Sequence, residues 1–249
     1  MKIMRQLFFG VLLPCVLCAG LAHAAGENYV LKGGKAFRVD GGKETPLKDC
    51  EVQKVDTETG SWAWILVDPG QSEEMKGSEG GIYFFRGKKN TPAGFLPVKE
   101  EASSCRVTFS PSGEKLLVIW GMEYIQHLSL YVVDKGKGFV KKVSFDVAGP
   151  PVWVDPHRFA VNIIDISKGP RVKGRFDLWW SSVMLFDSVE NEQIVIRKAT
   201  ATTDYTLNGC DTENGTLDVM ESTVKVVTDW KDDSKVKDTE LKIPVPSAG

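Results

Sequence analysis

Few residues of this chain have the types and the spacing that catalysis requires. Residues 25–249 contain no Gly-x-Ser-x-Gly nucleophile turn, no His-Glu-x-x-His zinc motif, no phosphate-binding glycine-rich loop and no Cys-x-x-Cys pair. Only two histidines, His127 and His157, occur in that part of the sequence. His157 follows Asp155 and Pro156, so we expect it to be a turn residue and not a general base. The sequence therefore predicts no catalytic residue, no metal ligand and no cofactor.

Two acidic turns invite a calcium interpretation, because hard cations prefer clustered oxygen ligands. They are residues 56–60, Asp-Thr-Glu-Thr-Gly, and residues 211–215, Asp-Thr-Glu-Asn-Gly. Both lack the alternating carboxylates and the distal glutamate of a calcium loop. Asp, Asn and Gly are also the residues that tight hairpin turns need for positive φ angles. The pattern favours hairpin turns over calcium sites.

The insertion at residues 167–181 combines cationic and aromatic side chains. These are Lys168, Arg171, Lys173, Arg175, Trp179 and Trp180. Tryptophan and arginine supply a disproportionate share of interface energy, so the combination suits a contact surface. In the alternative interpretation the tryptophans pack inside the fold and the cations are solvated. We predict that Arg171, Arg175, Trp179 and Trp180 bind a partner.

Three cysteines, Cys50, Cys105 and Cys210, lie beyond the first 24 residues. An oxidising compartment permits one disulfide among them. Cys50 and Cys105 each lie just ahead of the first strand of a repeated unit, so they occupy equivalent places in neighbouring units. A Cys50–Cys105 disulfide is the preferred prediction, and three separate buried thiols are the alternative.

The first 24 residues have the pattern of a cleaved signal peptide. Lys2 and Arg5 precede a short apolar stretch, and Ala22-His23-Ala24 supplies small residues at the cleavage site. Lipidation at Cys15 or Cys18 is the alternative. Loss of this segment takes the net charge from −2 to about −4, which argues against binding to nucleic acid. We expect residues 25–249 to form one domain in the periplasm or outside the cell, with no membrane-spanning segment.

A turn followed by an apolar run occurs four times along the chain. The turns are at residues 56–60, 110–113, 155–157 and 211–215. The two most distant turns, at Gly60 and Gly215, give an average period of about 52 residues, slightly longer than the ~40–45 of a propeller blade. The apolar runs are short and lack a helical period, which favours strands.

Each turn can be placed in a unit of four expected strands. The first unit covers residues 51–55, 62–67, 81–86 and 94–98, and the second 106–110, 115–120, 127–134 and 139–145. The third covers residues 152–154, 159–165, 182–187 and 193–197, and the fourth 205–209, 216–221, 224–228 and 239–245. Residues 29–48 remain as short strands that could belong to a fifth unit. The predicted fold is all-β and propeller-like with four or five antiparallel blades, and a β-sandwich is the alternative.

The second unit resembles the blade repeat of TolB-like and related WD40-like propellers. The resemblance lies in Val-Thr-Phe-Ser-Pro-Ser-Gly-Glu-Lys-Leu-Leu-Val at residues 107–118, followed by an apolar run ending in Asp134. That family typically has Ser-Pro-Asp-Gly at the turn, where this chain has Ser112 in place of the Asp. The resemblance implies a repeat-built β scaffold and transfers no catalytic residues.

These observations predict an exported, non-catalytic protein of the bacterial cell envelope that binds or scaffolds another envelope protein. The alternative is a small-ligand-binding protein or hydrolase that uses the central funnel of the propeller, where first strands converge. A fold alone does not decide between them, because function depends on sites carried by a shared scaffold.

Overall fold

The computed structural model describes residues 29–68, 70–76, 79–97, 105–122, 125–134, 138–165 and 180–247. It is all-β, with 63% strand and 5% helix, and its sheets are antiparallel. This confirms the all-β, antiparallel part of the predicted fold. The strands follow from short runs of β-branched and aromatic residues between turn-forming residues, since such side chains fit a pleated, half-buried surface.

The strands form successive antiparallel meanders in chain order. The first sheet contains β1 (Tyr29–Lys32), β2 (Lys35–Asp40) and β3 (Lys43–Pro46). The second contains β4 (Gln53–Thr57), β5 (Gly60–Val67), β6 (Gly81–Arg86) and β7 (Gly94–Pro97), with the short helix η1 (Glu73–Met75) between β5 and β6.

An eight-stranded sheet follows and consists of two meanders. The first has β8 (Cys105–Phe109), β9 (Lys115–Met122), β10 (Ile125–Asp134) and β11 (Gly138–Val147). The second has β12 (Val152–Trp153), β13 (Arg158–Asp165), β14 (Trp180–Asp187) and β15 (Glu192–Arg197). The ladder between β11 and β13 consists of a single pair, Val147 with Ile163, so we treat the two halves as separate meanders.

The last sheet contains β16 (Thr203–Asp211), β17 (Thr216–Thr223) and β18 (Lys237–Pro244). Between β17 and β18 lie the short helices η2 (Val227–Lys231) and η3 (Asp233–Lys235). The strand predicted at residues 224–228 is therefore wrong. Val224 and Trp230 instead form a small buried cluster there, because apolar residues in this segment pack beneath a turn and not in a ladder.

Consecutive meanders pack face to face, and each interface has its own hydrophobic cluster. Tyr29 and Ile65 belong to the cluster between the first and second sheets. Phe84 and Leu116 lie in the cluster between the second sheet and β8–β11. Further clusters join β8–β11 to β12–β15 and β12–β15 to β16–β18. The internal meanders are thus buried on both faces by their neighbours in sequence.

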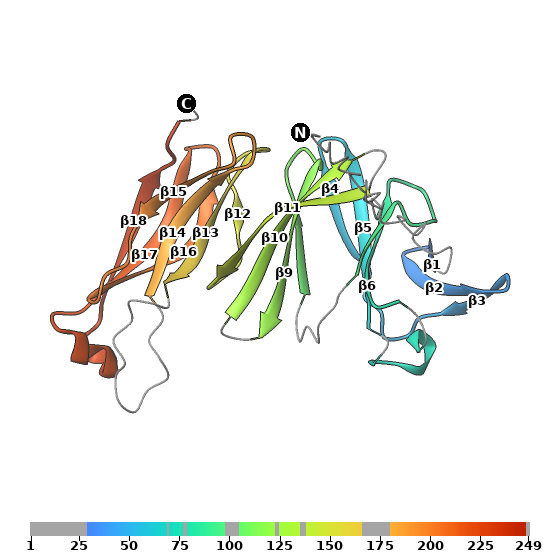
Figure 1. Ribbon diagram of the computed structural model, residues 1–249, viewed down its shortest axis with the longest axis horizontal. Helices are drawn as coiled ribbons and strands as arrows, with labels where there is room; N and C mark the ends of the chain where they lie inside the picture. The colour runs from blue at the N-terminus through green and yellow to red at the C-terminus, as the bar shows by residue number, and fades with distance from the viewer. Residues whose placement is uncertain are drawn as a thin grey trace, which may run out of the picture.

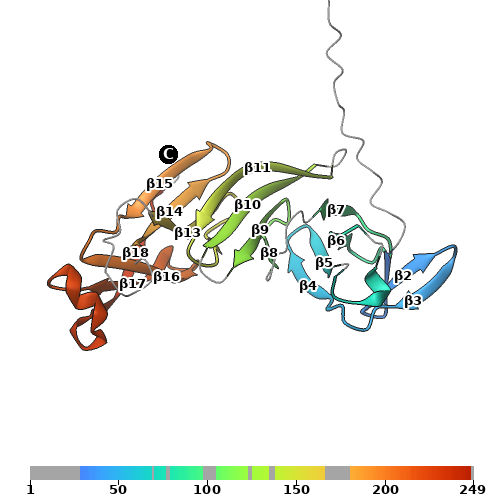
Figure 2. The same ribbon diagram turned by 60° about the horizontal axis from the view of Figure 1, so that its bottom comes forward.

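The meanders form an open array, in which the first and last sheets lie at opposite ends of the molecule (Figures 1 and 2). The first three predicted units correspond to β4–β7, β8–β11 and β12–β15, and residues 29–48 form the separate three-stranded sheet β1–β3. The array therefore consists of five meanders in the described part of the chain, the first and last with three strands each.

Candidate functional site

A hollow lies between the second sheet and strand β8. Its volume is about 200 Å³. The residues that line it are Asp49, Glu51, Gln53, Trp64, Leu66, Gln71, Ile82 and Cys105. Gln53 belongs to β4 and Cys105 to β8, so the hollow is bounded by the first strands of two neighbouring meanders.

Strand alternation explains why these residues face the hollow. Gln53 pairs directly with Trp64 on β5, so both point to the same side of the second sheet. Asp49 and Glu51 precede Gln53 at intervals of two and line the same hollow. Cys50 and Val52 alternate with them and pack on the opposite face, against the cluster shared with the first sheet.

The lining of the hollow favours a particular ligand chemistry. Two carboxylates and two amides, from Asp49, Glu51, Gln53 and Gln71, provide hydrogen-bond acceptors around an apolar wall that includes Trp64. No Lys, Arg or His stands among the described residues that line it. Carboxylates attract a cation through charge, and the face of an indole ring attracts it through its quadrupole. The arrangement suits a small group that carries positive charge or hydrogen-bond donors.

The thiol at the hollow is poorly suited to nucleophilic chemistry. Burial raises the pKa of Cys105 to about 12, and the reactive form of a cysteine is the thiolate. A nucleophilic cysteine needs a nearby positive charge to lower its pKa, whereas burial shifts the pKa of this thiol in the opposite direction. The geometry therefore favours binding over covalent catalysis at this position.

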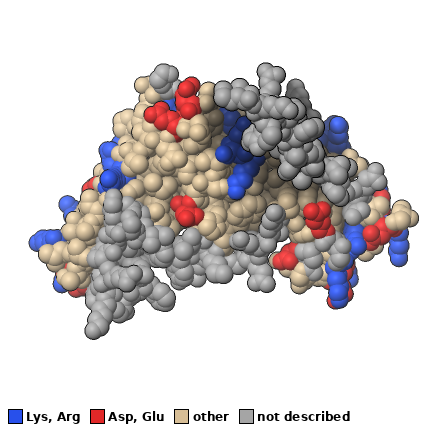
Figure 3. Space-filling model, in the orientation of Figure 1, with Lys and Arg blue, Asp and Glu red and all other residues tan. Residues whose placement is uncertain are grey.

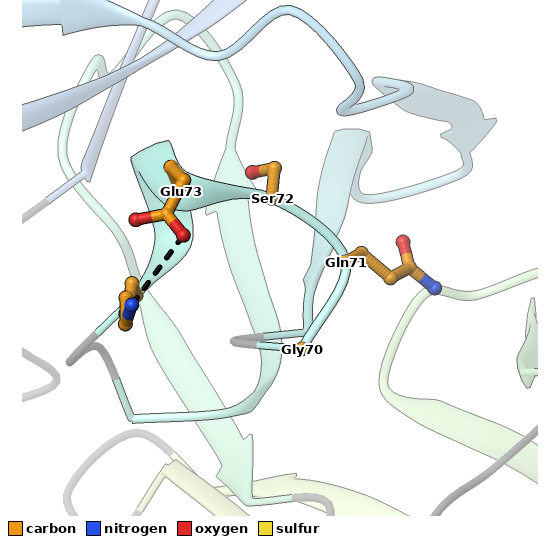
Figure 4. Close-up of a pocket in the computed structure, with 5 residues that line it drawn as sticks. Gly70, Gln71, Ser72 and Glu73 are labelled. Carbon is orange, nitrogen blue, oxygen red and sulfur yellow. Dashed lines mark hydrogen bonds and ion pairs between the residues drawn. The ribbon is translucent and has the colours of Figure 1, made fainter.

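A second hollow lies in the loop around η1 and has a volume of about 390 Å³. Gly70, Gln71, Ser72, Glu73 and Lys76 line it (Figure 4). Lys76 Nζ lies 3.4 Å from Glu73 Oε1, and both side chains are largely exposed. Figure 4 shows Gln71 pointing away from Glu73, and Gln71 also lines the hollow at Cys105. Exposed ion pairs of this kind contribute little energy, so the described residues of this loop form a shallow surface without an organised site.

The repeated turns form a connected row along the array. Glu58 N–H donates to the Pro111 carbonyl at 2.9 Å, and Thr59 Oγ1 donates to the Ser112 carbonyl at 2.6 Å. These two bonds join the turn of the second sheet to the turn between β8 and β9. At the far end, Arg158 donates to the Pro246 carbonyl at 2.5 Å. The turns thus position neighbouring meanders relative to one another.

Lys115 provides the central link of this row. Its Nζ donates to the Pro156 carbonyl at 3.3 Å and lies 2.7 Å from His157 Nδ1. Lys115 is buried, and desolvation lowers its pKa. An ammonium group has only donors, so the imidazole nitrogen facing protonated Lys115 is an acceptor. His157 is accordingly placed as a turn residue that ties β9 to the turn before β13, as the sequence predicted.

The acidic turns are hairpin turns in the structure. Asp211 accepts hydrogen bonds from the Asn214 backbone N–H at 3.0 Å and from Asn214 Nδ2 at 2.7 Å. Gly215 has a φ of 61°, which requires the conformational freedom of glycine. The described residues include no group of three or more His, Cys, Asp or Glu side chains that could hold a metal ion.

The structure does not form the predicted Cys50–Cys105 disulfide, and Cys50, Cys105 and Cys210 are free thiols. Cys50 packs with the cluster on one face of the second sheet, while Cys105 packs with the cluster on the other face. The sheet itself separates them. A disulfide requires Cα atoms within about 7 Å and Cβ atoms that face each other, which equivalent positions in neighbouring units do not guarantee.

Most of the predicted binding residues lie outside the described part of the chain. Arg171, Arg175 and Trp179 fall in that category. Trp180 is the first residue of β14, and its backbone pairs with Asp165. The predicted contact surface therefore remains a prediction.

The residues of the hollow at Cys105 were missed in the sequence, although a signal was present. Residues 49–53 read Asp-Cys-Glu-Val-Gln, an alternation of polar and apolar side chains. Such an alternation indicates an extended segment with one polar face. The sequence does not show which neighbouring strand that face meets.

No family model matches the chain, and a search of the curated proteins found no match. None of the helices in the part of the chain that the structure describes has the length and apolarity needed to cross a membrane.

Proposed function

We propose that the protein is an exported, non-catalytic binding or scaffolding protein of the bacterial cell envelope. The observation that carries this proposal is the open array of five meanders, because stacked repeats present long surfaces that bind partners. The meanders are interpreted as blades of a propeller-like repeat, in keeping with the TolB-like resemblance of residues 107–134. The signal-peptide pattern of residues 1–24 supports a location in the periplasm or outside the cell.

The proposed contact residues are Arg171, Arg175, Trp179 and Trp180, in the insertion that leads into β14. A photo-reactive amino acid at position 179 or 180 of the full chain should crosslink to one envelope protein in living cells. Purified partner should then bind the Trp179→Ala/Trp180→Ala variant at least about tenfold more weakly, since aromatic residues dominate interface energies.

A matched double variant in the loop around η1, Glu73→Ala/Lys76→Ala, changes two exposed side chains. It serves as the control and should bind normally. Equal affinity of the two double variants and the unmodified chain would count against the insertion as the contact surface. Failure to crosslink any partner from the insertion or from the loop around η1 would count against the scaffolding role itself.

The hollow at Cys105 supports a second candidate function, the binding of a small cationic ligand. The observation that favours it is the pair of carboxylates, Asp49 and Glu51, beside Trp64 without a cation among the described lining residues. A thermal-shift screen of small amines and guanidinium compounds tests this function. The Glu51→Gln variant should lose the stabilisation that an active compound produces, whereas Glu58→Gln, in the turn row, should keep it.

A further inference from the structure

The two end sheets of the array differ from the internal meanders in that only one face of each contacts a neighbouring meander. The cluster containing Tyr29 and Ala36 covers the inner face of the first sheet, and the cluster containing Leu217 and Ile243 covers the inner face of the last sheet. In repeat proteins a terminal unit normally has a polar outer face, because an uncovered apolar face invites association. The apolar and charged side chains on these two outer faces therefore indicate whether a further sheet can stack on either end of the array.

The outer face of the first sheet is apolar at its centre. The strand register places Val30, Phe37 and Pro46 in one row across β1, β2 and β3. Val39 lies next to this row on the same face. Phe37 and both valines are half-buried, yet none of the three belongs to a hydrophobic cluster of the described residues.

Positive side chains border this apolar row. Lys32 and Lys35 are paired across β1 and β2 on the same face and are exposed. The Lys32 ammonium also forms an ion pair with Glu44 on β3, so its aliphatic stem crosses the face. Charged side chains of both signs are visible at this end of the molecule in Figure 3. With two lysines against Glu44, the outer face of the first sheet carries a net positive charge.

The outer face of the last sheet has the reverse charge around a smaller apolar centre. Met220 lies in the middle strand, flanked by Thr206 on β16 and Glu240 on β18. Asp218 and Lys242 form an ion pair on this face, and Ser222 Oγ donates to Asp238 Oδ1 at 2.6 Å. With Asp218, Asp238 and Glu240 against Lys242, the face has a net negative charge.

We propose that a second copy of this chain stacks the outer face of its last sheet on the outer face of the first sheet. Phe37 would meet Met220, a pairing in which thioether and aromatic ring attract each other. Lys32 and Lys35 would face the acidic border of Asp218, Asp238 and Glu240. The contact repeats the face-to-face packing found four times inside the molecule. This self-association goes beyond the proposed envelope-binding function and does not depend on it.

The contact is heterologous, since it joins two different surfaces, and it therefore produces chains or rings of copies. A six-residue strand spans about 20 Å and three strands about 14 Å, so the area is small for a stable complex. We expect association in the range of about 10 µM to about 1 mM. Because charge complementarity contributes, raising the salt concentration should weaken it.

Sedimentation velocity of residues 25–249 across this concentration range tests the proposal. The unmodified protein should show concentration-dependent growth beyond a dimer at low salt. Phe37→Glu and Met220→Glu should each sediment as a monomer throughout. A mixture of these two variants should form a dimer and nothing larger, because each variant retains one intact face and the two intact faces are complementary.

Val195→Glu provides the control, since Val195 is exposed on β15 and lies on neither end sheet. It should associate like the unmodified protein, and circular dichroism should show that all variants are folded. A monomer at every concentration would overturn the proposal. So would a Met220→Glu variant that still dimerises while Phe37→Glu does not, because that pattern indicates symmetric contact between two first sheets.

Discussion

Two interfaces of the array use opposite means to join neighbouring sheets. Between the second sheet and β8–β11, aromatic rings pack directly on one another. Phe84 and Phe139 have centroids 4.5 Å apart, and Trp62 stacks on Phe109 at 5.0 Å. Between β12–β15 and β16–β18, buried Asn162 donates to the Tyr205 carbonyl at 2.9 Å and accepts from Leu207 N–H at 2.7 Å. We refer to these as the aromatic interface and the polar interface.

The difference shows how each interface obtains its specificity. Apolar contact is non-directional and scales with the area removed from water, so the aromatic interface depends on volume and shape. Hydrogen bonds are directional and costly to leave unmade when buried, so the polar interface depends on individual partners. The aromatic interface should therefore respond most to loss of volume, and the polar interface to loss of single polar groups and to pH.

The largest effect should come from removing a ring of the aromatic interface. Phe84 is fully buried and its ring lies against Phe139 and Phe109. Phe84→Ala should lower the free energy of unfolding by about 3–5 kcal/mol, through lost burial and the cavity left behind. Urea denaturation measures this loss. Val226→Ala, at a site 54% exposed, should change stability by less than about 0.5 kcal/mol, and equal losses would contradict the assigned packing.

The next effect should come from the central amide of the polar interface. Asn162→Leu keeps the branched shape and the number of side-chain heavy atoms but leaves the Tyr205 carbonyl and the Leu207 N–H without their partner. Unpaired buried polar groups cost about 1–3 kcal/mol each. Burial of the apolar leucine side chain offsets part of the cost of the two groups, so we expect a net loss of roughly 2–4 kcal/mol in the same denaturation measurement. Asn208→Leu, at an exposed position on β16, is the matched control. A neutral Asn162→Leu variant would show that this interface is held by its apolar contacts alone.

The polar interface should also make stability depend on pH through Asp204. Burial raises the pKa of its carboxyl to about 6, although it accepts a hydrogen bond from Ser181 N–H at 2.6 Å. The folded protein then retains a proton that the unfolded chain releases near pH 4, so stability should fall as the pH rises from about 4 to about 6. One pKa unit corresponds to about 1.4 kcal/mol.

Asp204→Asn removes this titration and keeps an acceptor for Ser181. Its melting temperature should vary less between pH 4 and pH 6 than that of the unmodified protein. Asp238→Asn, at an exposed position in the last sheet, is the control and should leave the pH profile unchanged. An unchanged profile in the Asp204 variant would show that its carboxyl titrates normally in the folded protein.

The smallest expected effect is a difference in the rates at which the three thiols are labelled. Burial raises the pKa of Cys105, in the aromatic interface, to about 12 and that of Cys50 to about 11. Burial also raises the pKa of Cys210, a thiol packed against the polar interface. A disulfide reagent at pH 8 should label Cys210 first, followed by Cys50 and then Cys105, because the thiolate is the reactive form.

Mass spectrometry of labelled peptides gives the order, and the Cys210→Ser variant should lose the fastest phase. Labelling of Cys50 and Cys105 only after reduction would show that the protein forms their disulfide after all. That result would also require a rearrangement of the second sheet, which separates the two thiols.

The local sequence determined where most strands and turns form. Alternating or continuous apolar runs between Gly, Pro and Asp residues correctly predicted the all-β class and the order of the units, because strand periodicity and turn conformation depend on neighbouring residues. The prediction failed at residues 224–228, where the chain forms a bend and the start of the short helix η2 in place of a strand. Their apolar character indicated burial, but the local pattern did not reveal the packing partner.

Only the tertiary structure decided which faces meet. Sequence alternation separates Cys50 from Glu51, but the neighbouring sheets determine that one packs in a core and the other lines a hollow. The same holds for Lys115, whose partners Pro156 and His157 lie about forty residues away in the chain. Contacts between stacked sheets join residues far apart in sequence, and their energy depends on side chains that no local pattern specifies. The repeated turns could therefore be located from the sequence, whereas the row that they form could not.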